Sequence, residues 1–297
     1  MRWYHVIILA AVTFCWIWAL PLLFAGALFS IPACVAALPA CILISTICQW
    51  RLHGQRVTTS WLRKMAATVP WHTWFPCNVL EIPKEPCIIT VHPHGVLCCA
   101  AVVGIHLVEG SETVFCVAPV LFYVPILGWL ARLMGCIPAT WDAMRSALDA
   151  GYPLIVVPGG VPELVLTEYR DDRRFFLEKR FGFVKLAMVT RVPLFPVWAR
   201  GETATYRLVH GPWLDKRVWL SWKLNIPLVL PWFRGWYNLW IPRRVPLELI
   251  HGTFLRTDTE CTRSSLVDFK QRYATELRRL ITIRERTLGP SFNLPGI

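Results

Sequence analysis

The first 50 residues carry an apolar pattern that the rest of the chain does not share. No Asp, Glu, Lys or Arg stands between Trp3 and Trp50. A helix that spans a bilayer needs about 20 apolar residues, so this run is long enough for two spans. Residues that favour a turn stand near its middle, namely Gly26, Ser30 and Pro32. The pattern therefore predicts a transmembrane helical hairpin in residues 1–50, with spans at Tyr4–Ala25 and Ala33–Gln49.

A cleaved signal peptide is the alternative interpretation of this run. Arg2 precedes the apolar residues, and Ala25-Gly26-Ala27 resembles a cleavage site. The apolar run continues for another span beyond that site, which favours a retained hairpin. Basic residues flank the hairpin, with Arg2 before it and Arg51, Arg56, Arg63 and Lys64 after it. Because positive charge stays on the cytosolic side of a membrane, we expect the part of the chain after the hairpin to face the cytosol.

Two further segments mix aromatic with basic side chains. Residues 51–87 are expected to form an interfacial linker that includes a helix at Val57–Val69. Residues 212–242 contain six tryptophans with lysines and arginines between them: Trp213, Trp219, Trp222, Trp232, Trp236 and Trp240. A buried aromatic subdomain is one interpretation of 212–242. The Trp, Lys and Arg mixture is more typical of a segment that lies at a membrane interface or re-enters it.

Residues 88–297 are expected to form a separate domain in which strands and helices alternate. Strands are predicted at Ile88–Val91, Thr113–Ala118, Pro153–Val157 and Leu194–Ala199, and helices at Ile126–Met134, Trp141–Ala150 and Phe175–Thr190. This alternation predicts an α/β layer with a mostly parallel sheet. A final amphipathic helix is indicated by apolar residues at helical spacing: Leu266, Phe269, Tyr273, Leu277 and Leu280.

Charge and cysteine content narrow the choice of partners. The net charge of +12 suits nucleic acid, anionic lipid or an acidic small molecule. No nucleic-acid-binding module is recognisable, so a lipid surface is the better partner. The 11 cysteines include no Cys-x-x-Cys pair, and several lie within the apolar run. They indicate reduced, buried thiols, with neither a zinc site nor a disulfide framework.

Two histidines follow the strand predicted at Ile88–Val91. In His92-Pro93-His94-Gly95, the proline restricts the backbone and the glycine permits a turn or a close approach to a ligand. Imidazole titrates nearest neutrality, so a pair of histidines at a strand end suits general-base work on a hydroxyl or thiol. A surface turn with two solvated histidines is the alternative for this motif taken alone.

The turn after the third predicted strand complements these histidines. In Pro158-Gly159-Gly160-Val161-Pro162-Glu163, two glycines allow backbone N–H groups to face a phosphate or an oxyanion, and Glu163 offers a carboxylate that can orient an imidazole. Functional groups of parallel sheets gather beyond the carboxyl ends of the strands, where both turns are expected. Together the two motifs favour acyl transfer.

The motifs resemble those of the type-2 diacylglycerol acyltransferase family, which includes monoacylglycerol and wax-alcohol acyltransferases within the glycerolipid acyltransferase superfamily. The resemblance rests on His92-Pro93-His94-Gly95, on Pro158-Gly159-Gly160 with Glu163, and on the segment from Arg180 to Ala187 that leads to Leu194-Phe195-Pro196-Val197. It implies a multi-pass enzyme of the endoplasmic reticulum membrane and lipid droplets, with a glycerolipid-acyltransferase-like fold. Phe181 stands where the family often has Lys, Arg200-Gly201-Glu202 replaces an FGE-like sequence, and the His-x4-Asp dyad of the superfamily is absent.

The resemblance implies transfer of a fatty acyl group from acyl-CoA, as co-substrate, to a lipid hydroxyl, with diacylglycerol the favoured acceptor. We expect His94, ahead of His92, to be the general base, with the other histidine and Glu163 fixing tautomer and charge. Pro93, Gly95, Pro158, Gly159 and Gly160 would shape the substrate site, the last two through backbone N–H groups. Four basic residues would meet the CoA phosphates or form a solvated helix face: Arg173, Arg174, Lys179 and Arg180. No metal or other cofactor is required.

Other functions compatible with these residues stay open. A monoacylglycerol or wax-alcohol acyltransferase differs only in its acceptor, which would be an acylglycerol or a long-chain alcohol. A noncatalytic membrane-anchored lipid-binding protein belongs to another class, and a metallohydrolase that uses the His-x-His pair is a weaker alternative. The sequence leaves open the acceptor, the acyl-chain preference and whether the chain forms a homo-oligomer.

Overall fold

The computed structural model describes residues 66–68, 75–83, 85–108, 111–123, 128, 131–132, 134–166, 175–208, 213–224, 233–235, 237 and 242–288. The predicted hairpin in residues 1–50 lies outside this set, as do nearly all of the Val57–Val69 helix and most of the helix predicted at Ile126–Met134. None of the helices that the structure describes is both long and apolar enough to cross a bilayer.

A six-stranded sheet in the order β3-β2-β4-β1-β5-β8 forms the centre of the domain. Its strands are β1 (Ile88–His92), β2 (Val114–Val117), β3 (Cys136–Pro138), β4 (Leu154–Val156), β5 (Leu194–Arg200) and β8 (Glu248–His251). All neighbouring strands run parallel except the edge strand β8, which is antiparallel to β5. The prediction of a mostly parallel α/β layer is confirmed, and the four predicted strands match β1, β2, β4 and β5 to within about one residue at each end.

Strand β1 lies in the interior of the sheet, between β4 and β5, and all five of its residues are buried. Side chains of a strand point alternately to the two faces of a sheet. Ile89 and Val91 pack in one apolar cluster, whereas Ile88 packs in another on the opposite face. His92 shares its face with Ile88, which directs its ring toward the helices on that side.

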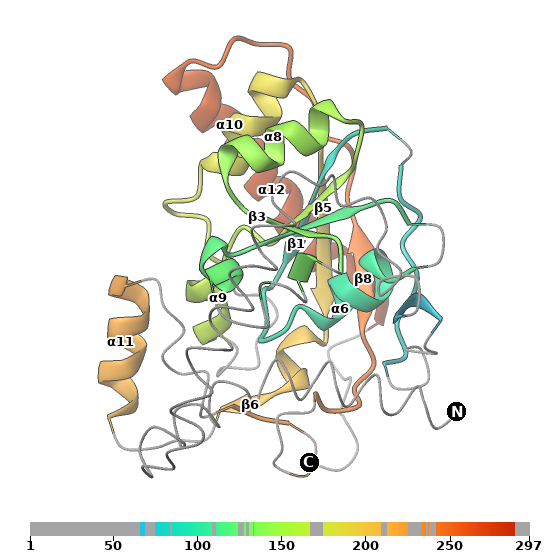
Figure 1. Ribbon diagram of the computed structural model, residues 1–297, viewed down its shortest axis with the longest axis vertical. Helices are drawn as coiled ribbons and strands as arrows, with labels where there is room; N and C mark the ends of the chain where they lie inside the picture. The colour runs from blue at the N-terminus through green and yellow to red at the C-terminus, as the bar shows by residue number, and fades with distance from the viewer. Residues whose placement is uncertain are drawn as a thin grey trace, which may run out of the picture.

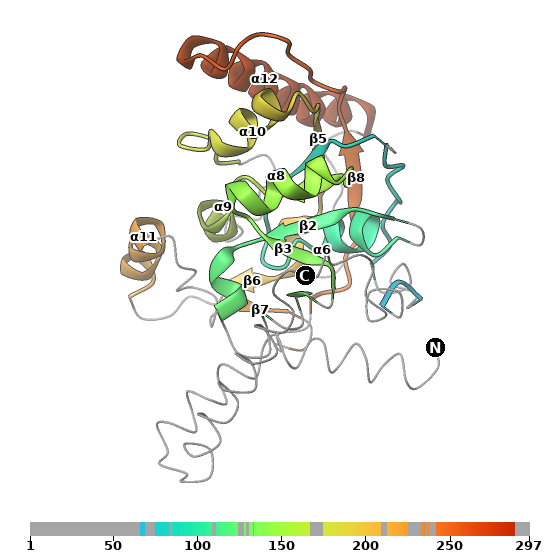
Figure 2. The same cartoon turned by 45° about the horizontal axis from the view of Figure 1, so that its top comes forward.

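Those helices are α8 (Trp141–Asp149), α10 (Gly182–Thr190) and α12 (Arg263–Leu288). Figure 2 shows the three helices together on one side of the sheet. Helix α12 buries Phe269, Tyr273, Leu277 and Leu280, which are four of the five apolar positions predicted for the last helix. The other face is covered by α6 (Cys99–Ala101), a π-helical turn (Val102–His106) and the chain around Phe75 to Ile82.

The remaining elements are short or lie at the side of the sheet. They are the 3-10 turns Pro119–Tyr123 and Glu202–Thr205, helix α9 (Val161–Leu166), helix α11 (Leu214–Leu224), and the two-stranded ribbon of β6 (Arg207–Leu208) and β7 (Phe233–Arg234). Figure 1 shows α9 below the sheet and α11 beyond it at the edge of the molecule.

The helix predicted at Phe175–Thr190 is wrong in its first turns. Helix α10 begins only at Gly182, and residues 175–181 are irregular. The backbone N–H of Phe176 donates a hydrogen bond to the Glu163 side chain instead of starting a helix. The Phe175 ring packs edge-on against His92. Contacts distant in sequence have therefore overridden the local helical pattern.

Candidate active site

The sheet order brings the two predicted motifs to one edge. Strands β1 and β4 are parallel neighbours, with Thr90 opposite Val156. The turn His92-Pro93-His94-Gly95 leaves the carboxyl end of β1, and Pro158-Gly159-Gly160 leaves the carboxyl end of β4 before α9 begins. Parallel strands present the same end at the same edge of a sheet, so the two turns meet. Pro93 and Pro158 are buried within these turns.

Glu163, in the first turn of α9, connects the two motifs. Its Oε1 atom lies 2.6 Å from Nδ1 of His92, and both side chains are fully buried. Its Oε2 atom accepts a hydrogen bond of 3.0 Å from the backbone N–H of His94. The Phe176 N–H donates to Oε1 at 2.8 Å. One carboxylate therefore orients the His92 ring and also holds the backbone of His94.

The His94 side chain is partly exposed and has a different partner. Its Nδ1 lies 2.8 Å from the carbonyl oxygen of Gly95. A carbonyl only accepts hydrogen bonds, so Nδ1 carries the proton and Nε2 of the neutral ring carries the lone pair. Burial lowers the pKa of His94 from its ordinary value, with opposing contributions from the Gly95 carbonyl and from Glu163. The ring is thus a neutral base at physiological pH.

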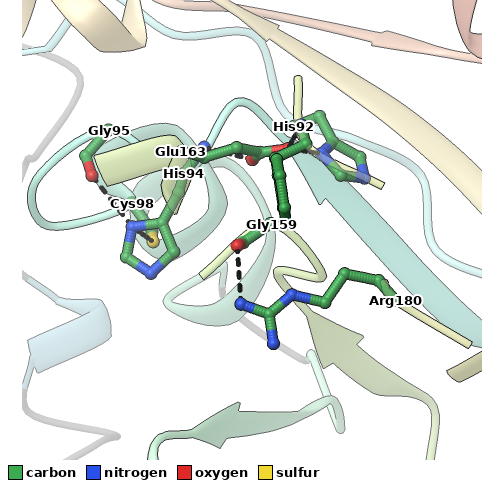
Figure 3. Close-up of polar contacts among 8 residues, drawn as sticks. His92, His94, Gly95, Cys98, Gly159, Glu163 and Arg180 are labelled. Atoms are coloured by element: carbon green, nitrogen blue, oxygen red, sulfur yellow. Dashed lines mark hydrogen bonds and ion pairs between the residues drawn. The ribbon is translucent and has the colours of Figure 1, made fainter. Parts of the chain in front are cut away.

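The two histidines are not equivalent. Figure 3 shows their rings on opposite sides of the Glu163 carboxylate. The His92 ring packs near Phe175 and Tyr273, and its Nε2 atom is buried with no hydrogen-bond partner among the described residues. The sequence-based hypothesis had the other histidine and Glu163 fix the tautomer of the base. In the structure the Gly95 carbonyl sets the tautomer of His94, and Glu163 reaches His94 only through its backbone.

The glycines of the two turns make room for charged side chains. A Cβ atom added to Gly159 would overlap the carboxylate of Glu163. Gly160 has a positive φ of 59°, and its carbonyl accepts the N–H of Leu164 as α9 begins. The structure thus gives Gly159 a steric role beside Glu163. The oxyanion-binding role of the Gly159 and Gly160 N–H groups stays a prediction.

The four basic residues expected to meet the CoA phosphates differ in where the structure places them. Arg180 is half-buried, and its Nη2 atom donates a hydrogen bond of 3.2 Å to the carbonyl of Gly159 (Figure 3). Lys179 is exposed on the turn before it. Arg173 and Arg174 fall in a part of the chain that the structure does not describe. Of the two basic residues that the structure describes here, Arg180 is the one placed against the candidate site.

Comparison with known proteins identifies the family. A family model described as "Diacylglycerol acyltransferase" matches residues 29–289, which is most of the chain. The chain belongs to the diacylglycerol acyltransferase family. It is 30% identical over 186 residues to the mouse protein "Diacylglycerol O-acyltransferase 2-like protein 6", an alignment that covers 56% of this chain and 54% of the mouse protein. The chain therefore spans about half the length of the first curated relatives it matches.

Other similar proteins extend over more of the chain. Human "2-acylglycerol O-acyltransferase 3" is 23% identical over 259 residues, covering 78% of this chain and 75% of the human protein. Bovine "2-acylglycerol O-acyltransferase 1" is 26% identical over 247 residues, covering 75% of this chain and 73% of the bovine protein. Among solved structures, the 1-acyl-sn-glycerophosphate acyltransferase PlsC from Thermotoga maritima aligns with a TM-score of 0.47 at 14% identity, over 84% of this chain and 98% of that one.

In this member of the diacylglycerol acyltransferase family, a second buried carboxylate holds the other end of the turn that carries His94. Glu202 follows β5 and is fully buried. Its two oxygens accept hydrogen bonds from the backbone N–H groups of Cys99, at 2.9 Å, and Ala100, at 2.8 Å. Gly95, with a φ of 57°, brings its Cα close enough that an added Cβ would lie 2.5 Å from Cγ of Glu202.

Glu202 is a site residue that the sequence motifs do not single out, since it stands there only as part of Arg200-Gly201-Glu202. A usable signal was present, because Glu202 follows the strand predicted at Leu194–Ala199, and the strands of a mostly parallel sheet end at the same edge. The structure shows that this strand, β5, is parallel to β1. Glu163 and Glu202 together hold both ends of the segment from His92 to Ala100.

The cysteines beside His94 are unsuited to covalent catalysis. The Cys98 Sγ atom lies 3.6 Å from Nδ1 of His94. Burial, together with the charge of Glu202, raises the pKa of both the Cys98 and the Cys99 thiols well above the ordinary value. The thiolate is the nucleophilic form of cysteine, so these groups stay protonated and unreactive.

Proposed function

We propose that this protein transfers a fatty acyl group from acyl-CoA to the hydroxyl of an acylglycerol, with diacylglycerol as the acceptor and triacylglycerol as the product. Membership of the diacylglycerol acyltransferase family supports the reaction class. The single observation that carries the proposal is the arrangement of His94, whose Nδ1 donates to Gly95 and whose Nε2 is thereby left as the basic atom of a partly exposed ring.

The reaction requires one proton to move twice. The Nε2 atom of His94 accepts the proton of the acceptor hydroxyl as that oxygen attacks the thioester carbonyl. The new carbon–oxygen bond forms, a tetrahedral oxyanion develops, and the carbon–sulfur bond then breaks. The departing CoA thiolate takes the proton back from His94, which restores the neutral imidazole. No covalent acyl-enzyme is needed, which agrees with the raised thiol pKa of Cys98 and Cys99.

The neighbouring residues have supporting roles in this proposal. Glu163 is a positioning residue, since it holds the His94 backbone and the His92 ring. Gly159 and Gly160 would donate backbone N–H groups to the oxyanion. Arg180, anchored to the Gly159 carbonyl, supplies a cation beside that turn that would meet a phosphate of CoA.

A monoacylglycerol is the second candidate acceptor. The two aligned 2-acylglycerol O-acyltransferases cover 78% and 75% of this chain, more than the 56% covered by the mouse diacylglycerol O-acyltransferase 2-like protein. A long-chain alcohol is a third candidate, and a noncatalytic lipid-binding role is the alternative from another class.

One assay separates these candidates. The purified full chain would be supplied with radiolabelled oleoyl-CoA and, in parallel, diacylglycerol, 2-monoacylglycerol or a long-chain alcohol, and the products resolved by thin-layer chromatography. We expect the highest kcat/KM with diacylglycerol. A higher value with 2-monoacylglycerol or the alcohol would change the acceptor only. No labelled ester from a folded preparation with any acceptor would overturn acyl transfer and leave the lipid-binding role.

The proposed location is the endoplasmic reticulum membrane and lipid droplets, with the domain of residues 88–297 facing the cytosol. The basic residues on both sides of the uncharged run support this orientation. Protease added to sealed microsomes with the cytosolic side outward should cleave the chain after Arg51. Full protection of that region in intact microsomes would contradict the proposed orientation.

A further inference from the structure

Helix α11 presents a stripe of aromatic and basic side chains to solvent. The stripe consists of Trp213, just before the helix, and Lys216, Trp219 and Lys223 within it. Lys216, Trp219 and Lys223 are three or four residues apart, so they lie on one side of the helix, and Trp213 joins them through its contact with Lys216. Trp213 is 69% exposed and Trp219 is 60% exposed. Such exposure is unusual for the largest aromatic side chain, which is ordinarily well buried.

The lysines of this stripe stack on its tryptophans. The Lys216 ammonium lies 4.5 Å from the Trp213 ring centroid, and the Lys223 ammonium lies 4.8 Å from the Trp219 ring centroid. Each pair thus places an indole and a positive charge side by side on the outer surface. Indoles partition to the headgroup level of a bilayer, and lysines there attract anionic lipid headgroups.

The opposite side of α11 packs on the candidate active site. Ser221 is buried, and Val218 packs against an apolar cluster that includes Val96 and Leu164. Val96 follows the His94-Gly95 turn, and Leu164 follows Glu163 in α9. Figures 1 and 2 both show α11 beside α9 at the edge of the molecule. A surface that binds the outer side of α11 would therefore lie close behind the catalytic turn.

We propose that the outward stripe of α11 docks on the headgroup region of a phospholipid bilayer that contains anionic lipids. Charge complementarity favours this occupant over a protein, because lysine is depleted at the centres of protein interfaces whereas the Trp and Lys mixture is typical of interfacial helices. Binding at this stripe does not depend on acyl transfer. Its consequence, that the site opens at the membrane plane where lipid acceptors reside, rests on the function proposed above.

Hydrogen exchange of the full chain provides a test that does not measure activity. The protein would be reconstituted in phosphatidylcholine nanodiscs with or without 20% phosphatidylserine, and peptic peptides from residues 213–224 followed by mass spectrometry. A docked helix opens less often, so its amides exchange more slowly. Each surface cation contributes about fivefold in binding to anionic lipid, so we expect at least fivefold slower exchange in the anionic discs. Equal exchange in both discs would overturn the proposal.

Charge-reversal variants identify the residues responsible. Lys216→Glu with Lys223→Glu should abolish the difference between the two kinds of disc. The matched control reverses two exposed arginines of α12, Arg263→Glu with Arg278→Glu, and should keep the difference. Loss of the difference in the control as well would show a nonspecific effect of net charge and overturn the assignment to α11. Protection that instead appears in lipid-free detergent and rises with protein concentration would assign the stripe to a second copy of the chain, which also overturns it.

Discussion

The Glu163 carboxylate and the His92 imidazole form a fully buried pair, with Oε1 2.6 Å from Nδ1. The second oxygen of the same carboxylate accepts the backbone N–H of His94. A buried pair that loses one member leaves an uncompensated polar or charged group in the interior. The Oε1 atom of Glu163 therefore joins β1 to α9, and its Oε2 atom holds the turn that carries the proposed base.

His94→Ala should abolish most of the activity and leave the fold intact. General-base catalysis contributes about 100- to 10,000-fold, so kcat should fall by that factor while the thermal midpoint changes little. His251→Ala is the matched control, because its Nδ1 also lies near the carbonyl of the following glycine, at 3.3 Å, but on the exposed edge strand β8. Activity of His94→Ala above about a tenth of the parent would remove His94 as the base.

The pH profile of the parent enzyme tests the same role of His94. The base acts in its neutral form, and burial lowers the pKa of His94 below its ordinary value of 6.5. Protonation therefore requires a more acidic solution than it does for a free imidazole, and kcat/KM, which reports the free enzyme, should begin to fall only below about pH 6.5. An acid limb centred above pH 7 would contradict a neutral, desolvated imidazole.

His92→Ala and Glu163→Gln should each reduce both stability and kcat, and the double variant should be barely worse than the worse single variant. Breaking a buried pair costs on the order of 3 kcal/mol, and two groups that act as one unit do not give additive losses. Thermal unfolding and steady-state kinetics of the three proteins provide the measurement. Losses that multiply in the double variant would mean independent roles.

Glu248→Gln is the control for the comparison of the His92→Ala, Glu163→Gln and double variants. Glu248 forms a partly exposed ion pair with Arg200 at 3.8 Å. Such pairs contribute little to stability, so this variant should change neither the thermal midpoint nor kcat appreciably.

Gly159→Ala should cost most of the activity through displacement of Glu163. The added methyl group would overlap the Glu163 carboxylate, which then cannot hold both His92 and the His94 backbone. Gly182→Ala at the start of α10 is the comparison, because a Cβ there meets nothing within 4 Å. We expect at least tenfold lower kcat for Gly159→Ala and parental kcat for Gly182→Ala. Equal behaviour of the two variants would refute the steric role of Gly159.

Glu202→Gln should lower kcat by at least tenfold with a nearly unchanged KM for acyl-CoA. Each carboxylate oxygen of Glu202 accepts one backbone N–H, from Cys99 or from Ala100. Gln replaces one of these oxygens with an NH2 group, which is a donor, so one of the two hydrogen bonds is lost and the turn that carries His94 loses its position. Glu276→Gln is the control, since Glu276 also accepts a backbone N–H, from Thr253 at 2.9 Å, on the outer loop beside α12. A rise in KM without a fall in kcat would exclude positioning of the base by Glu202.

Arg180→Gln should raise the KM for acyl-CoA by about tenfold and affect the KM for the acceptor much less. A charge-assisted hydrogen bond to phosphate contributes about 1.5 to 3 kcal/mol. Lys179→Gln, on the adjacent exposed residue, should have a smaller effect that disappears at high salt. An unchanged KM for acyl-CoA in Arg180→Gln would exclude a contact between Arg180 and a CoA phosphate.

The sequence by itself determined four strands of the central sheet, the buried side of the last helix and the edge of the sheet at which the two motifs gather. The runs around Ile89, Phe115, Ile155 and Phe195 predicted four strands because apolar β-branched and aromatic residues favour buried strands. The spacing from Phe269 to Leu280 predicted the buried side of α12 because a helix repeats about every 3.6 residues. The two motifs at strand ends followed from the same local signals, as did the expectation that they meet.

Only the tertiary structure decided which site residues contact one another. The pairing of His92 with Glu163 and of Glu202 with Cys99 joins positions 71 and 103 residues apart, and depends on which strands are neighbours. Glu163 also affects where α10 begins. Because the Phe176 N–H donates a hydrogen bond to Glu163, the preceding segment stays irregular and α10 begins only at Gly182. The two histidines of the motif also differ in burial, which their sequence context does not reveal. His92 points into the core because of its position on β1, whereas His94, in the following turn, is only partly exposed and has the Gly95 carbonyl to set its tautomer.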